Sequence, residues 1–139
     1  MIYSEYINKE TKGWTDILDI TEDVKRIVSR SGIQNGLVTI AVSSSTSAIA
    51  TLEFESGLVA DFKKALEQVA PVKGKYAHEA KWHDGNGFAH IRSALVGTSK
   101  TIPLHAANLL SGAWQQIILV DFDNRPRSRK VFVQVFGEK

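Results

Sequence analysis

The sequence has no cysteine among its 139 residues. This absence excludes disulfides and thiolate metal sites, so only histidine, aspartate or glutamate could hold a transition metal. There is no apolar stretch approaching ~18 residues, so we expect no transmembrane helix. The first ten residues, MIYSEYINKE, also lack the basic start and apolar run of a signal peptide. We therefore expect a cytoplasmic protein that does not act on membranes.

A large charge of one sign is absent too. The 17 lysine and arginine residues nearly balance the 15 acidic ones, and the net charge of +2 is too small to make nucleic acid the main partner. The nucleotide-binding patterns GxGxxG and GxxxxGK[ST] do not occur, and neither does the GxSxG pattern around a nucleophilic serine. The sequence therefore does not indicate a nucleotide-binding loop or a serine hydrolase.

What the sequence does contain is typical of one globular domain. Its length fits a single domain over residues 1–139, and such a chain buries about two thirds of its unfolded surface. Apolar residues make up 43% of the chain and charged residues 23%, which is a globular composition. We see no linker, repeat or low-complexity segment.

Hydrophobic periodicity predicts two helices and seven or eight strands. The helices are expected at about 21–31, ended by Gly32, and from Ser56 to the residue before Pro71. Strands are expected in the following segments: 2–10, 13–20, 36–44, 47–54, 88–97, 101–110, 113–122 and 130–138. Because helices and strands do not alternate strictly, the pattern favours an α+β fold over a wound parallel sheet.

Three of the four histidines lie in the segment HEAKWHDGNGFAH, residues 78–90. The pairs Asp84-Gly85 and Asn86-Gly87 favour a tight turn, which would bring His78 beside His90. If residues 88–96 form a strand, His90 and Arg92 point to the same side. The other interpretation is a polar loop whose histidines cap turns.

Two imidazoles with a nearby carboxylate are typical ligands of zinc or another divalent ion. Asp84, Glu79 or the more distant Glu53 could supply the oxygen. His83 and His105 have no such partners in the sequence, and we expect no role for them.

A second polar cluster is DFDNRPRSRK, where Arg125, Arg127 and Arg129 are spaced by two residues. An extended chain would direct all three to one side, and guanidinium groups bind phosphate or carboxylate well. The alternative is an exposed strand edge that carries charge against aggregation.

A third cluster is SSSTSA, from Ser43 to Ala48, between two predicted strands. Hydroxyls such as those of Ser45 and Thr46, together with backbone N–H groups, can surround an anion. The alternative is an ordinary polar loop.

In this order, the three clusters resemble the YjbQ-like family, which has long been catalogued as uncharacterised and has also been labelled "secondary thiamine-phosphate synthase enzyme". The matching segments are STSAIATLEFESGL, YAHEAKWHDGNGFAHIRSALVGTSKTIPL and LLSGAWQQIILVDFDNRPRSRKVFVQVFGE, with a weaker match in DILDITEDV. The resemblance extends over nearly the whole chain.

This resemblance implies two packed, mostly antiparallel β-sheets with two α-helices, and a homotrimer. It implies that His78 and His90 are functional histidines and that Arg125, Arg127 and Arg129 bind phosphate. It also implies that Trp114 and Gln115 shape the ligand pocket.

The chain departs from the common family pattern at two positions: Phe88 replaces one histidine, and Ser45 stands before Thr46 where many members have histidine. A three-histidine site therefore cannot be assumed, and Glu53 becomes a candidate oxygen donor.

The family label implies a transferase that joins a hydroxymethylpyrimidine diphosphate to a thiazole phosphate. From this we expect a metal-assisted enzyme acting on a small phosphorylated metabolite. The divalent cofactor would be zinc or magnesium and would help pyrophosphate leave. His78, His90 and Glu53 are the candidate catalytic residues, and His78, His90 and Asp84 the candidate metal ligands. Ser45 and Thr46 join the arginines as candidate phosphate-binding residues. The alternative is a trimeric module that binds a phosphorylated metabolite without turnover.

Overall fold

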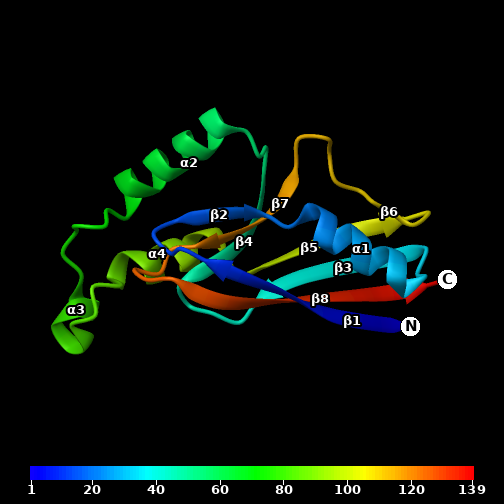
Figure 1. Ribbon diagram of the computed structural model, residues 1–139, viewed down its shortest axis with the longest axis horizontal. Coiled ribbons are helices and arrows are strands. Elements are labelled where there is room, and N and C mark those ends of the chain that lie inside the picture. Colours follow the sequence, from blue (N-terminus) through cyan, green and yellow to red (C-terminus); the bar gives the residue numbers. More distant parts are fainter.

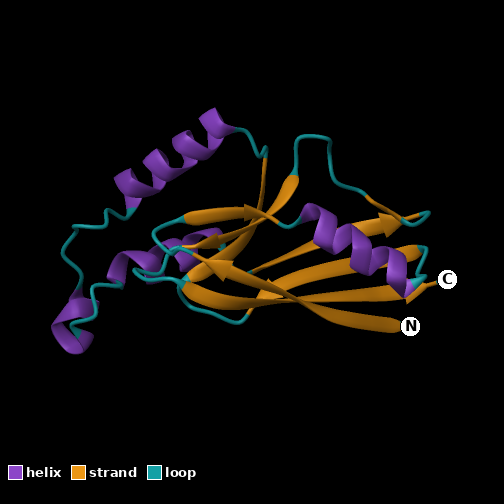
Figure 2. Cartoon of the chain, viewed as in Figure 1, coloured by secondary structure: helices purple, strands orange, loops and turns teal.

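The computed structural model describes all 139 residues as two antiparallel sheets and four helices (Figures 1 and 2). The larger sheet has the strand order β1-β8-β3-β5-β6. Its strands are β1 (Ile2–Thr11), β3 (Asn35–Val42), β5 (Ser99–His105), β6 (Asn108–Leu109) and β8 (Arg127–Glu138). The smaller sheet has the order β2-β7-β4, with β2 (Asp16–Asp19), β4 (Ser47–Leu52) and β7 (Gln116–Asp121).

The smaller sheet forms the middle layer of the molecule. In β7, Ile117 and Leu119 point to one side and join the core between the two sheets. Ile118 and Val120 point to the other side and join a second core under helices. Because both faces are covered, β7 reads as a continuous apolar run and not as an alternating one.

Helix α1 (Thr21–Ser31) packs beside the smaller sheet on the inner face of the larger one, as Figure 1 shows. Val24, Ile27 and Val28 form its buried stripe. Gly32 ends it in the left-handed conformation, at φ 68°. The predicted bounds and the glycine stop are confirmed.

The second core lies under α2 (Ser56–Val69) and α4 (Gly87–Val96). The Glu55 carboxylate caps α2 by accepting the backbone N–H groups of Gly57 and Leu58 at 2.7 and 2.8 Å. These hydrogen bonds lower the pKa of Glu55. The predicted start at Ser56 and end before Pro71 are confirmed. None of the helices is long and apolar enough to cross a bilayer.

The predicted strand at 88–97 is wrong, and the fold has four helices where two were expected. Residues 87–96 form α4, and α3 (Ala77–Trp82) precedes it. Phe88 and Arg92 are buried on one side together with Ala89 and Ser93, which is helical spacing. In the sequence, Ala89, Ile91 and Leu95 also fit a two-residue period, but Ile91 and Leu95 are exposed in the structure. Contact with β4 and β7 favours the helix, and sequence periodicity alone does not reveal that contact.

We predict that Leu119→Ala lowers the free energy of unfolding by about 2–5 kcal/mol. Leu119 is fully buried between the sheets, so the smaller side chain loses apolar contacts and leaves a cavity. Leu110→Ala, at a position 58% exposed, should change it by less than about 0.5 kcal/mol. Urea unfolding of both variants measures the difference. Equal losses would contradict the layer arrangement.

Candidate functional site

His78, Asp84 and His90 meet where α3 and α4 join. His78 lies in the first turn of α3, Asp84 in the connecting turn and His90 in the first turn of α4. One ligand atom from each lies within 4.8 Å of the other two. The two imidazole rings have centroids 4.5 Å apart, and His78 Nδ1 is 3.3 Å from Asp84 Oδ1. The prediction that His78 and His90 face one another across the DGNG turn is confirmed, although the turn joins two helices and not two strands.

The close approach of α3 and α4 depends on Gly87. A Cβ atom at this position would lie 2.6 Å from Tyr76 Cβ and 2.8 Å from Glu79 Oε1. The Gly87 N–H instead donates to Glu79 Oε1 at 2.6 Å, and this carboxylate also lies 3.5 Å from His78 Nδ1. Glu79 therefore fixes the start of α4 and lies behind His78.

The turn between the helices is attached to the turn between β7 and β8. Asn124 Nδ2 donates to the carbonyl of Asp84 at 2.6 Å, and the Asn124 N–H donates to Asn86 Oδ1 at 3.0 Å. Asn86 Nδ2 in turn contacts Asp123 Oδ1 at 3.3 Å. These bonds position Asp84 and the two histidines relative to the sheets.

The cluster opens onto a polar pocket of about 400 Å³ with no apolar lining residue. Its walls come from the loop after β3, the α3–α4 turn and the first residues of β8. The lining residues are Ser43, Ser44, Ser45, Thr46, Asp84, Asn86, His90, Asp123, Arg127 and Arg129. The structure thus brings together His90, Asp84, Ser45, Thr46 and two of the three predicted arginines.

Those two arginines are paired with buried carboxylates. Arg129 binds Asp121 through two hydrogen bonds of 2.8 and 2.9 Å. Arg127 Nη2 donates to Asp123 Oδ2 at 3.0 Å. The alternative of an exposed sheet edge is wrong, because β8 lies between β1 and β3. Arg125 is exposed in the turn before β8 and does not line the pocket.

Asp123 connects the pocket walls. Burial by itself would raise its pKa, but hydrogen bonds from Arg127, Thr46 and Asn86 outweigh burial and hold the pKa below the ordinary value of 3.8. Thr46 Oγ1 donates to Asp123 at 2.9 Å and accepts from Arg129 Nη2 at 2.8 Å. Asp121 and Asp123 were not identified as site residues from the sequence. Two aspartates spaced by two residues at the end of a buried strand would have indicated a polar site there.

The predicted residues Trp114, Gln115 and Glu53 lie away from this pocket. In the smaller sheet, Ser47 of β4 pairs with Asp121 of β7, and Leu52 pairs with Gln116. Glu53 and Trp114 therefore lie at the far end of the two strands, roughly 20 Å from the Thr46 end at ~3.3 Å per residue. Trp114 is 73% exposed, and Gln115 lines a different cavity. Within one chain they do not complete the histidine cluster.

Arg92 also differs from its prediction. It does not share a face with His90 but is buried, where it donates to the carbonyl of Ala70, to Thr15 and to Glu67. Its role is to attach α4 to the end of α2. His83 and His105 are exposed and stand outside the cluster.

Comparison with known proteins gives one consistent family. A family model described as UPF0047 protein YjbQ-like matches residues 5–138. A UPF0047 protein from Methanothermobacter thermautotrophicus is 35% identical over 137 residues, covering 99% of this chain and 94% of that protein.

Solved structures of proteins from the same family superpose on nearly the whole chain. A YbjQ-like protein of unknown function from Sulfolobus solfataricus superposes with a TM-score of 0.95 at 32% identity, covering 99% of both chains. An uncharacterized conserved protein of the YjbQ/UPF0047 family from Clostridium acetobutylicum has a TM-score of 0.87 at 32% identity, covering 95% of this chain and 99% of that one.

We predict that Asp123→Asn destabilises the protein at pH 7 by on the order of 2 kcal/mol, since Arg127 and Thr46 lose a charged acceptor. The folded state lowers the pKa of Asp123, so its contribution is present above pH 3.8 and is lost as the pH falls further. The difference between wild type and variant should therefore shrink below about pH 4. Urea unfolding at several pH values measures this, with the exposed Asp61→Asn as control. A difference that stays constant down to pH 3 would contradict it.

Proposed function

The chain belongs to the UPF0047 YjbQ-like family, and on that premise we propose that it is a metal-assisted enzyme acting on a small phosphorylated metabolite. The family resemblance seen in the sequence is confirmed, while the activity is our proposal. The observation that carries it is the convergence of His78, Asp84 and His90 beside an all-polar pocket that Asp84 and His90 line.

The donor set suits a divalent ion. Two nitrogens and one carboxylate oxygen form a three-residue site that leaves positions open for ligand oxygens. With bonds of ~2.0–2.1 Å, ligands on one ion lie at most ~4.2 Å apart, so atoms within 4.8 Å need only a small adjustment. Two imidazoles favour a zinc-like ion over magnesium, which prefers oxygen ligands.

The net charge of the pocket makes phosphate binding depend on a bound metal ion. Asp84 and Asp123 offset Arg127 and Arg129 in the pocket lining, and Asp121 lies behind Arg129. With neutral histidines the region therefore carries an excess of negative charge and attracts a cation before an anion. A bound divalent ion would reverse this sign. Phosphate binding in this pocket should then depend on the metal.

The pocket residues have distinct roles in this proposal. The Ser43–Thr46 loop would donate hydroxyl and backbone hydrogen bonds to phosphate oxygens, and Arg127 lines the pocket beside this loop. The ion, when bound, would neutralise charge on departing phosphate oxygens. The candidate reaction is the joining of a pyrimidine diphosphate to a thiazole phosphate: a C–N bond forms, a C–O bond breaks and pyrophosphate leaves with the electron pair.

We predict that purified protein binds zinc at one site per chain and that His78→Ala or His90→Ala weakens this binding at least about tenfold, since each removes one ligand. Asp84→Asn should weaken it less, because the amide oxygen remains. His83→Ala and His105→Ala are matched controls and should bind as the wild type does. Calorimetric titration measures the affinities. Equal affinity in the cluster variants and the controls would contradict the site.

Turnover separates an enzyme from a binding module. We expect zinc-dependent release of pyrophosphate from the two phosphorylated precursors, lost in His78→Ala and His90→Ala and retained in His83→Ala. If phosphorylated ligands bind in a zinc-dependent way without any turnover, the non-enzymatic module is the correct interpretation.

We also propose that the chain forms a homotrimer. In support, the outer face of the larger sheet carries an apolar row across four strands. The register pairs Ile2 with Phe136, Phe136 with Leu37 and Leu37 with Pro103. Phe136 is 57% exposed, and all four lie on the face opposite the core. Exposed rows of this kind are typical of subunit contacts.

Sedimentation equilibrium should give about 46 kDa, three times the chain mass of 15.3 kDa. Phe136→Glu should lower this mass, because a charge would have to be buried in the contact. Lys130→Glu, also on the outer face, serves as the control for a changed charge. A wild-type monomer at micromolar concentration would contradict the trimer.

A further inference from the structure

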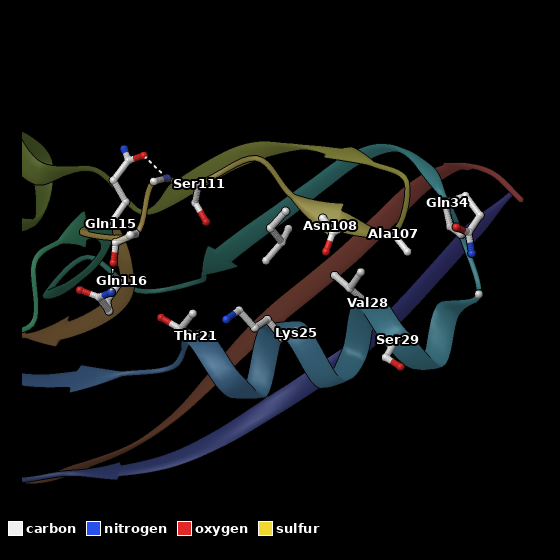
Figure 3. Close-up of a pocket in the computed structure, with 15 residues that line it drawn as sticks. Thr21, Lys25, Val28, Ser29, Gln34, Ala107, Asn108, Ser111, Gln115 and Gln116 are labelled. Carbon is white, nitrogen blue, oxygen red and sulfur yellow. Dashed lines mark hydrogen bonds between the residues drawn. The ribbon is translucent and has the colours of Figure 1, made fainter.

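A second cavity lies at the opposite end of the smaller sheet from the histidine cluster (Figure 3). It has a volume of about 580 Å³ and is lined by α1, by the β5–β6 hairpin and by the loop that leads into β7. A cavity of this size accommodates a small organic molecule. None of its lining residues belongs to the polar pocket of the histidine cluster.

Lys25 is the only charged residue in its lining. Figure 3 shows this side chain on the α1 wall with its nitrogen directed toward the end formed by Thr21 and Gln116. Its partner Glu22 is 3.3 Å away, but both side chains are more than half exposed. An exposed ion pair of this kind contributes little, so Lys25 is available to a ligand.

Gln115 and Asn108 also line the cavity, and each keeps one amide group without a hydrogen-bond partner. Gln115 Oε1 accepts the Gly112 N–H at 2.7 Å, which leaves its NH₂ group to donate. Asn108 Nδ2 donates to the Ala106 carbonyl at 2.8 Å, which leaves its oxygen to accept. Gln116, in contrast, uses both ends, with Phe54 N–H and the Ala113 carbonyl, and forms a fixed wall.

The hairpin wall is held in a strained conformation. Ala106 and Ala107 both have positive φ, at 47° and 63°, where glycine or asparagine is usual. The Ala107 N–H donates to the Gln34 carbonyl at 2.9 Å, and the Ala106 N–H donates to Asn35 Oδ1 at 3.1 Å. Strain of this kind is concentrated at ligand-binding segments, and here it places the small Ala107 side chain in the cavity lining.

We propose that this cavity is a second binding site, for a small organic carboxylate with at least one further hydrogen-bonding group. Lys25 balances one negative charge, whereas a phosphate dianion would need a second cation. The carboxylate would lie against Lys25, and the amides of Gln115 and Asn108 would bind the polar part. Val28 and Leu109 offer apolar contact to the rest of the molecule. The site is independent of the proposed metal chemistry.

The test uses pairs of probes in which the carboxylate is replaced by its uncharged amide: nicotinate and nicotinamide, and succinate and succinamide. The protein is isotope-labelled and first passed over a chelating resin that removes divalent ions. Each probe is then titrated into it while amide NMR signals are followed. At least one acid should shift the signals of residues 25–34 and 107–116. It should bind roughly tenfold more tightly than its amide, as expected for one charge-assisted hydrogen bond.

Lys25→Met should remove this preference, and Lys64→Met, on the exposed side of α2, should leave it unchanged. Three results would overturn the proposal: no acid shifts these signals, amides bind as tightly as acids, or Lys25→Met keeps the preference. Because divalent ions are absent from this titration, failure here is distinguishable from failure of the histidine cluster to bind zinc.

Discussion

The pairing of Asp121 and Asp123 with Arg129 and Arg127 is the interaction on which the rest of the site depends. It joins the end of β7 to the start of β8, so the two sheets meet at a fixed position. Thr46 adds the start of β4 by bonding to both Asp123 and Arg129. Asn86 then attaches the α3–α4 turn to Asp123. The histidines are thereby held against a framework of buried charge.

This framework explains why the pocket resembles a cation site more than an anion site. Guanidinium groups that bind internal carboxylates have little positive charge left for a ligand. The sequence spacing of the arginines indicated phosphate binding, but it contained no information on the aspartates that would face them. A divalent ion at the histidine cluster would restore the positive charge that a phosphorylated molecule needs.

Much of the fold was predictable, because the periodic segment 21–31 and the continuous apolar run in β7 indicate which of their residues are buried. The junction of His78 and His90 was also predictable, since the glycines and asparagine of the DGNG segment favour a turn. The helix α4 was not, because its short apolar pattern fits both periods and only contact with the second core decides. The separation of Glu53, Trp114 and Gln115 from the histidines was missed for another reason. It follows from the antiparallel register of β4 and β7, which no local pattern specifies.

The most direct test of the central claim is the position of the metal itself. Crystals grown with zinc should give an anomalous difference peak about 2.0–2.2 Å from one nitrogen each of His78 and His90 and from an oxygen of Asp84. A strong peak coordinated elsewhere, or none at this cluster at saturating zinc, would contradict the claim that these three residues form a metal centre.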